Sequence, residues 1–360
     1  MEVISKVWFA PIEEGFEKNG ISNKVLNLYE EIIKEKENNP DKDDFVAVKI
    51  HFGEQENIGY VKPDYLSKLL SKIKLEGSKP YFTDANTLYE GQRDNAVDHS
   101  IQAHEHGFTF ENTGLPVIIA DGLLSKNYTE VEISETHFDR VSIANDILHS
   151  DYLLSIAHVT GSPATGFGAT LKNLGMGCAS RSGKQLQHAD VKPKIDREKC
   201  EVCGSCVKWC PVDAISIKEG KYAIIDEETC YGCAECLTVC SFDAVSNLGD
   251  STTKLLQEKI AEYTLGVLKD KGSKNIFYNF LTHVTEGCDC SSEPQEKVID
   301  DIGIMASTDP VAIDQASIDL LNEKTGKDLF KELQGMEYTY QLKHAKKIGL
   351  GERDYELSEI

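Results

Sequence analysis

Eight of the eleven cysteines in this 360-residue chain form two runs with one shared spacing. The runs are Cys200-x2-Cys203-x2-Cys206-x3-Cys210 and Cys230-x2-Cys233-x2-Cys236-x3-Cys240. Thiolates at this spacing bind [4Fe–4S] clusters, and each run gives three ligands to one cluster and its fourth ligand to the other. The spacing therefore predicts two [4Fe–4S] clusters and a function in electron transfer.

The predicted ligand sets cross between the two runs. One cluster is expected on Cys200, Cys203, Cys206 and Cys240, and the other on Cys230, Cys233, Cys236 and Cys210. Two structural zinc sites are the alternative, because Cys-x2-Cys pairs also bind zinc. Zinc sites rarely use eight cysteines in runs of three plus one, so the sequence favours iron–sulfur clusters.

Residues 192–247, which contain both runs, form an internal repeat in which the Cys230 run repeats the Cys200 run. Between the runs, residues 214–226 alternate in polarity around a glycine turn, which predicts a small β-hairpin. We expect one small α+β module of the bacterial ferredoxin type, with two clusters in one pseudo-symmetric unit.

The chain on both sides of this module alternates between strand and helix patterns. Predicted strands cover 45–52, 80–85, 116–122, 151–159 and 274–281, and predicted helices cover 21–38, 62–74, 95–107, 137–149, 252–270, 310–323 and 337–348. Such alternation favours an α/β domain with a mostly parallel sheet. We expect one discontinuous host domain, 1–191 plus 248–360, interrupted by the module at 192–247.

Polar residues follow several of the predicted strands. His51, Asp84, His158 and His283 each stand at or just beyond a strand end. Ligands of open parallel sheets bind outside the carboxyl ends of the strands. A single such histidine is more often structural, but their coincidence favours a site. With Lys172, which follows a nearby loop, these four residues are the candidate catalytic groups.

A loop rich in glycine and threonine, residues 160–173, runs into a predicted helix. Backbone amides at a helix start can hold an anion or a phosphate. The loop therefore supplies candidate cofactor-binding residues, namely Gly166, Gly168, Lys172 and Asn173. It matches neither a P-loop nor a dinucleotide fingerprint, and a glycine turn used for tight packing is the alternative.

Other charged residues are candidates of lower specificity. Arg181 and Lys184 could hold a carboxylate or phosphate, or they could be solvated bases in a linker. Asp300, Asp301 and Asp314 are candidate acid–base or metal-binding groups. Asp314 lies one turn into a helix that Asp309-Pro310 is expected to begin.

Three cysteines lie outside the two runs: Cys178, Cys288 and Cys290. The Cys288-Asp289-Cys290 sequence could form a redox dithiol. With Cys178 or His188 it could also complete a further metal site, because soft thiolates favour zinc or iron. Reduced thiols that bind nothing are the alternative.

Composition limits the classes of partner. The formal charge of −22 and the pI of about 4.9 argue against nucleic acid, which needs a basic face. An acidic surface favours partners that carry positive docking patches. No run of 18 apolar residues predicts a membrane helix, and the N-terminus lacks the apolar core of a secretion signal. We expect a cytoplasmic protein, since iron ligation by cysteine fits a reducing compartment.

Several motifs together resemble a family known as domain of unknown function 362, in its form with an embedded two-cluster ferredoxin. The motifs are VAVKIHFGE, GFGATLKNLGMGCASRSGK, the eight-cysteine segment, GCDC and GIMASTDPVAID. The resemblance implies a cytoplasmic iron–sulfur protein, common in anaerobes, and implies no particular reaction.

Three functions follow from these patterns. The first is a redox enzyme whose clusters feed the host site, with a small-molecule acceptor or with a further metal or flavin in the host domain. The second is a non-catalytic electron carrier or maturation partner that docks to a redox partner protein. In the third, the clusters are structural and the host domain binds a small anion.

Overall fold

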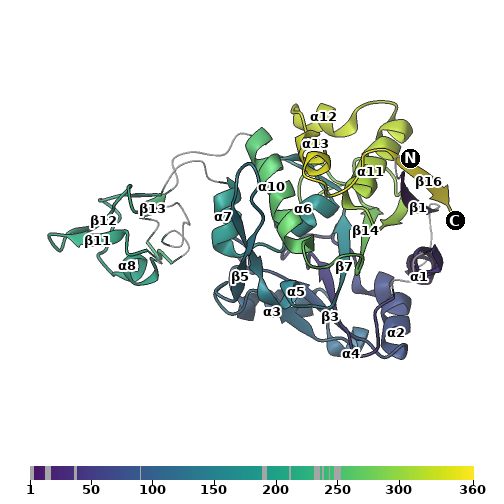
Figure 1. Cartoon of the computed structure of the whole chain (residues 1–360), viewed down its shortest axis with the longest axis horizontal. Helices are drawn as coiled ribbons and strands as arrows, with labels where there is room; N and C mark the ends of the chain where they lie inside the picture. Colours follow the sequence, from purple (N-terminus) through teal and green to yellow (C-terminus); the bar gives the residue numbers. More distant parts are fainter. Residues whose placement is uncertain are drawn as a thin grey trace.

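The computed structural model describes residues 4–12, 18–35, 39–89, 91–188, 193–210, 212–230, 236, 239–242, 244–246 and 253–360. Its main feature is an eight-stranded sheet in the order β16-β1-β15-β14-β7-β2-β3-β4 (Figure 1). The strands are β16 (Tyr355–Glu359), β1 (Ser5–Pro11), β15 (Gly303–Ser307), β14 (Asn275–Leu281), β7 (Tyr152–His158), β2 (Phe45–Ile50), β3 (Lys79–Asp84) and β4 (Val117–Ile119).

Most neighbouring strands of this sheet are parallel. The strands β14, β7, β2, β3 and β4 form a continuous parallel block, in which Val48 of β2 lies between Leu154 of β7 and Phe82 of β3. Only β15 runs against its neighbours β14 and β1. The predicted mixed α/β fold with a large, mostly parallel sheet is confirmed.

Helices cover both faces of the sheet. Successive residues of a strand point to opposite faces, so the apolar side chains on each face need a covering layer. Val46 and Val48 of β2 share one core with the helices α1 (Lys18–Glu35) and α2 (Ser67–Leu75). Ala47 belongs to the other core, which includes side chains of α6 (Thr170–Gly175), α10 (Thr253–Leu268), α11 (Pro310–Thr325) and α13 (Tyr340–Lys347) (Figure 1). The host domain therefore has three layers.

The remaining described elements are short. On the host side they are η1 (Pro63–Leu66), α3 (Ala96–Glu105), α4 (Phe110–Thr113), β5 (Tyr128–Glu132), β6 (Arg140–Ala144), α5 (Asn145–Leu148), β8 (Thr160–Ser162), β9 (Gly166–Gly168), α7 (Arg181–His188) and α12 (Leu329–Gln334). In the cysteine segment they are β10 (Lys194–Ile195), α8 (Ser205–Trp209), β11 (Ile215–Lys218), β12 (Tyr222–Ile225) and β13 (Val245–Ser246). The predicted hairpin is present, since β11 pairs antiparallel with β12.

One predicted helix is wrong. Residues 137–149 form strand β6 followed by the single turn α5, and β6 pairs antiparallel with β5. Val141 and Ile143 are β-branched and buried, and both face the core beside α10. Their two-residue alternation suits a half-buried strand better than a helix. The edge strand β16 and its neighbour β1 were not predicted.

The segments before and after the cysteine runs meet in one sheet. Strand β7 precedes the runs and β14 follows them, yet the two pair in parallel, with Ile156 opposite Tyr278. The small sheets of the cysteine segment, β10–β13 and β11–β12, are separate from the eight-stranded sheet (Figure 1). Across the described ranges, no helix has the length and apolarity needed to cross a bilayer.

Candidate functional site

Four cysteines from both runs line one cavity in the cysteine segment. They are Cys200, Cys203, Cys206 and Cys240. These are the four residues that the spacing assigns to one cluster, and Cys240 reaches the cavity from the second run. Apolar side chains complete the wall, among them Ile217. Of the other predicted set, Cys233 lies outside the described residues.

The cysteine sulfurs accept hydrogen bonds from backbone amides. The Ala223 N–H donates to Cys200 Sγ at 3.4 Å, and the Ala214 N–H donates to Cys210 Sγ at 3.2 Å. Hydrogen bonds of this kind adjust the reduction potential of iron–sulfur clusters. Burial raises the pKa of the Cys206 thiol, because the apolar shell disfavours an uncompensated thiolate.

The spread of these sulfurs differs from that of a zinc site. A tetrahedral zinc ion with bonds of about 2.3 Å holds its sulfur ligands about 3.8 Å apart. Within the described part of the chain, no three cysteine sulfurs lie within 4.8 Å of one another.

The host domain has its own pocket, about 350 Å³ in volume, at the carboxyl ends of β2, β3 and β7. Its lining includes nine residues singled out from the sequence as site candidates: His51, Asp84, His158, Gly168, Lys172, Asn173, His188, Cys288 and Cys290. It also includes Lys184, considered above as an anion ligand. Segments distant in the sequence thus meet at the predicted edge of the sheet.

Three candidates lie elsewhere. The His283 ring nitrogen Nε2 contacts the Gln295 carbonyl oxygen at 3.0 Å. Cys178 is fully buried in the core. Gly166 packs so closely on Tyr338 that an added Cβ would lie 2.5 Å from the tyrosine Cβ. None of the three lines the pocket.

The other charged candidates have structural partners. Asp314 accepts hydrogen bonds from the Thr170 and Leu171 amides, each at 2.9 Å. Asp301 accepts one from the His283 amide, and Asp300 pairs with Lys297. The Arg181 guanidinium donates to the carbonyl oxygens of Asp94 and Leu88.

Two cationic residues of the pocket, Lys49 and Arg93, were not identified as candidates from the sequence. Both contact Asp84. Lys49 Nζ lies 2.9 Å from Asp84 Oδ1, and Arg93 lies 3.2 Å from Asp84 Oδ2. Burial acts to raise the pKa of Asp84, but Lys49, His99 and Arg93 bring that pKa well below its usual range. Asp84 is therefore a fixed carboxylate that positions the cations, and Lys49 also donates to Asn173 Oδ1 at 2.8 Å.

His51 presents an unused hydrogen-bond donor. Its Nδ1 accepts from the Gly53 amide at 2.9 Å. Burial and the nearby Arg93 charge lower the pKa of His51 to about 3, so the ring is neutral and Nε2 carries the hydrogen. Among the described residues Nε2 has no partner, and neither does Asp289 Oδ1, which also belongs to a pocket-lining residue. A bound ligand could satisfy both atoms.

His158 is held as a cation. Its Nδ1 lies 2.7 Å from Asp289 Oδ2, and its Nε2 lies 2.7 Å from the Thr282 carbonyl oxygen. Both partners are acceptors, so both ring nitrogens carry hydrogens. Burial acts to lower the pKa of His158, but the Asp289 carboxylate outweighs it and the net pKa is raised. His158 therefore contributes positive charge to the pocket.

Cys288 and Cys290 differ in their ionisation. Lys172 Nζ lies 3.4 Å from Cys288 Sγ and 3.0 Å from Ser162 Oγ. The hydrogen bond from the Cys290 thiol and the Lys172 charge lower the pKa of Cys288, although burial opposes them. The pKa of Cys290 is correspondingly raised. The two shifts favour a thiolate on Cys288 and a thiol on Cys290.

Two solved structures are similar to this chain at low identity. A crystal structure of a Thermotoga maritima protein aligns with 93% of this chain and 60% of that chain, with 10% identity and a TM-score of 0.40. The lactate racemase apoprotein from Thermoanaerobacterium thermosaccharolyticum aligns with 86% of this chain and 55% of that chain, with 11% identity and a TM-score of 0.44. This chain thus spans less than two thirds of either. No curated protein matches it.

A family profile matches residues 46–319, which is more than half of the chain. The match begins in β2, includes the pocket-lining segments and the cysteine runs, and ends in α11. The chain belongs to the family described as Domain of unknown function (DUF362).

Proposed function

We propose that the chain is an iron–sulfur redox protein that binds two [4Fe–4S] clusters in residues 192–247. The observation that carries this proposal is the cavity lined by Cys200, Cys203, Cys206 and Cys240. This shared lining fits the crossed ligand arrangement of a two-cluster module. Clusters of this kind persist in a reducing compartment, which supports a cytoplasmic location.

The host pocket is the proposed site of reaction. Cys288 and Cys290 both line the pocket, and the Cys290 amide donates a hydrogen bond to Cys288 Sγ at 3.4 Å. Joining the Cys288 thiolate to the Cys290 thiol releases two electrons and one proton, and reducing the resulting disulfide consumes two electrons and one proton. Two clusters that each carry one electron match this requirement. The pair could therefore connect the clusters to a two-electron substrate without a flavin or a further metal.

The lining of the pocket supports an anionic small-molecule substrate. Four lysine or arginine side chains line it, against two aspartates, in a chain whose net charge is −22. The cationic His158 adds to the positive charge, and the Cys288 thiolate removes part of it. A carboxylate or phosphate group would bind most favourably near Lys172 and the free His51 Nε2–H.

The ligand assignment is tested by two cysteine variants. In Cys240→Ser, iron content and the spectrum of the dithionite-reduced protein should change, because one cluster loses its fourth ligand. In the matched control Cys178→Ser, which alters a buried cysteine of the host core, both should match the wild type. An unchanged spectrum in Cys240→Ser would show that the crossed ligand set is wrong.

A reductive titration distinguishes a redox enzyme from a simple electron carrier. The acidic net charge would also suit the carrier function. After mild oxidation and anaerobic purification, the wild-type chain should take up about four electrons, two in the clusters and two in the cysteine pair. Cys288→Ser should take up about two, with its iron content unchanged. If both proteins take up two electrons, the pair is not redox-active and the carrier function is favoured.

A further inference from the structure

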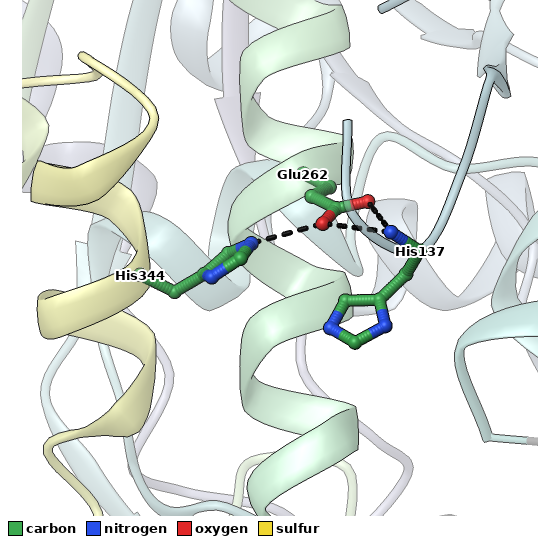
Figure 2. Close-up of side chains that lie close together, drawn as sticks. All are labelled: His137, Glu262 and His344. Atoms are coloured by element: carbon green, nitrogen blue, oxygen red, sulfur yellow. Dashed lines mark hydrogen bonds and ion pairs between the residues drawn. The ribbon is translucent and has the colours of Figure 1, made fainter. Parts of the chain in front are cut away.

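A separate group of polar side chains lies on the helical face of the host domain, apart from the residues that line the pocket. His137, Glu262 and His344 each offer a ligand atom, and these atoms lie within 4.8 Å of one another (Figure 2). Glu258 lies beside them, with Oε2 2.9 Å from His137 Nε2. We propose that these four side chains bind one divalent transition-metal ion, such as Zn²⁺.

Three segments of the fold bring the ligands together. Glu258 and Glu262 are four residues apart on α10, so they share one face of that helix. His344 comes from α13, and His137 comes from the loop between β5 and β6 (Figure 2). Helices α10 and α13 pack directly on each other.

The donor atoms suit zinc. Two imidazole nitrogens and two carboxylate oxygens make a four-ligand set of the types that Zn²⁺ prefers. His344 Nε2 lies 2.9 Å from Glu262 Oε1, and His137 Nε2 lies 2.9 Å from Glu258 Oε2. Ligands around a tetrahedral zinc ion with bonds of about 2.0–2.2 Å lie about 3.4 Å apart. The ligand atoms of His137, Glu262 and His344 are already near this spacing, and a movement of the Glu258 side chain would complete the set.

The burial of Glu262 favours a bound cation beside its carboxylate. Its carboxylate is fully buried and accepts hydrogen bonds from the amides of His137 and Phe138 at 3.0–3.1 Å, and from His344 Nε2. None of these partners is a permanent cation. A buried carboxylate is costly unless it is paired with a cation or coordinates a metal. The backbone amides hold it in place, as outer-shell groups do for metal ligands.

Two histidine–glutamate ion pairs are the competing explanation. In that arrangement His137 and His344 are both protonated, and each pairs with one glutamate. The metal requires both imidazoles to be neutral, with their Nε2 atoms as ligands. The two arrangements are distinguished by whether an ion binds.

The test is a Zn²⁺ titration of the anaerobically purified chain, with its clusters intact, after brief treatment with a chelator. We expect the wild type to bind about one Zn²⁺ per chain and to gain in unfolding temperature when Zn²⁺ is present. Glu258→Gln and His137→Ala change the two less buried ligands and should weaken binding by about 100-fold. The control His104→Gln changes an exposed histidine of α3 and should bind as the wild type does.

Two outcomes would overturn the proposal. If the wild type binds no Zn²⁺ and its unfolding temperature does not change, the residues form ion pairs only. If Zn²⁺ binding persists in His137→Ala but is lost in Cys288→Ser, the ion is bound in the pocket. Neither outcome depends on the proposed iron–sulfur function, because iron content is measured separately in each protein.

Discussion

At the scale of single residues, the pocket is organised by charges that fix one another. Asp84 holds Lys49 and Arg93, and Asp289 holds His158 as a cation. Lys172 faces a thiol instead of a carboxylate, so its charge stabilises the Cys288 thiolate. In the proposed function, the reactive group of the pocket is the Cys288 sulfur, and the aspartates position the cations.

The pH dependence of Cys288 alkylation tests this account. Because the pKa of this thiol is lowered, the thiolate forms at a lower pH than in an ordinary cysteine, whose pKa is about 8.5. The alkylation rate with iodoacetamide should therefore rise with pH to a midpoint clearly below that value. Lys172→Met should move that midpoint upward by about one pH unit or more, which slows alkylation by several-fold at pH values below the wild-type midpoint.

Mass spectrometry of the Cys288 peptide measures this rate without interference from other thiols. The control Lys42→Met removes an exposed lysine that does not line the pocket, and should leave the midpoint unchanged. A wild-type midpoint near 8.5, the value of an ordinary cysteine, would contradict the lysine–thiolate pair.

At the scale of secondary-structure elements, parallel strands bring the site together and buried hydrogen bonds fix the adjoining helices. Strands β2, β3 and β7 end at the same edge of the sheet, which places His51, Asp84 and His158 around one pocket. Asp314 of α11 binds the first two amides of α6, the short helix that carries Lys172. The position of Lys172 thus depends on a contact at the N-terminus of α6, which begins only two residues before it.

Replacing Asp314 should destabilise the host domain. In Asp314→Ala, the amides of Thr170 and Leu171 and the Asn279 side chain each lose a buried acceptor. Each unsatisfied donor costs about 1–3 kcal/mol, so a loss of about 4 kcal/mol is expected. Urea denaturation followed by far-UV circular dichroism measures it.

A substitution on the same helix provides the control. Lys324→Ala changes an exposed residue in the last turn of α11 and should cost about 0.5 kcal/mol or less. A comparable loss of stability in both variants would mean that the Asp314 contacts are not responsible.

The strands of the parallel block and their carboxyl-end residues were predictable, because apolar runs with β-branched residues mark buried strands. Lys49 gave a signal that was not used, since it is a lysine within an apolar strand. Asp289 gave another, because it lies between the two pocket cysteines. Arg93 gave none, since its role depends on a loop conformation that brings it to Asp84.

The glycine-rich segment shows why local pattern alone misleads. Gly175 lies in a glycine-rich run of the kind that can bring backbone close to a ligand, but an added Cβ there would lie 2.1 Å from the Ile260 carbonyl oxygen of α10. Its role is close helix packing. His137 and His344 were missed for a related reason: their shared location depends on how a loop and two helices pack, which no spacing in the sequence records.

At the scale of the whole molecule, a strongly acidic chain contains a pocket whose charged lining residues are mostly cations. The net charge of −22 should attract cationic redox partners and repel anionic ones over distances of about one Debye length. At short range, the cations that line the pocket favour anionic ligands instead. Cationic partners would then dock on the acidic surface, whereas anionic substrates would bind in the pocket.

Electron exchange with small charged mediators tests whether the net charge of the chain selects its redox partners at long range. At low ionic strength, a dicationic viologen should exchange electrons with the clusters about tenfold faster than a sulfonated, anionic viologen of similar potential. The ratio should approach one in about 0.5 M salt, because the charges are then screened. Stopped-flow absorbance of the clusters measures both rates, and a ratio that does not respond to salt would argue against charge-driven docking.

The measurement that tests the central claim most directly is the iron, zinc and acid-labile sulfide content of the anaerobically purified chain. Two [4Fe–4S] clusters predict about eight iron and about eight sulfide per chain, with an absorbance that dithionite bleaches. About two zinc ions bound by the eight cysteines, with neither iron nor labile sulfide, would contradict the account and leave the cysteine runs as structural zinc sites.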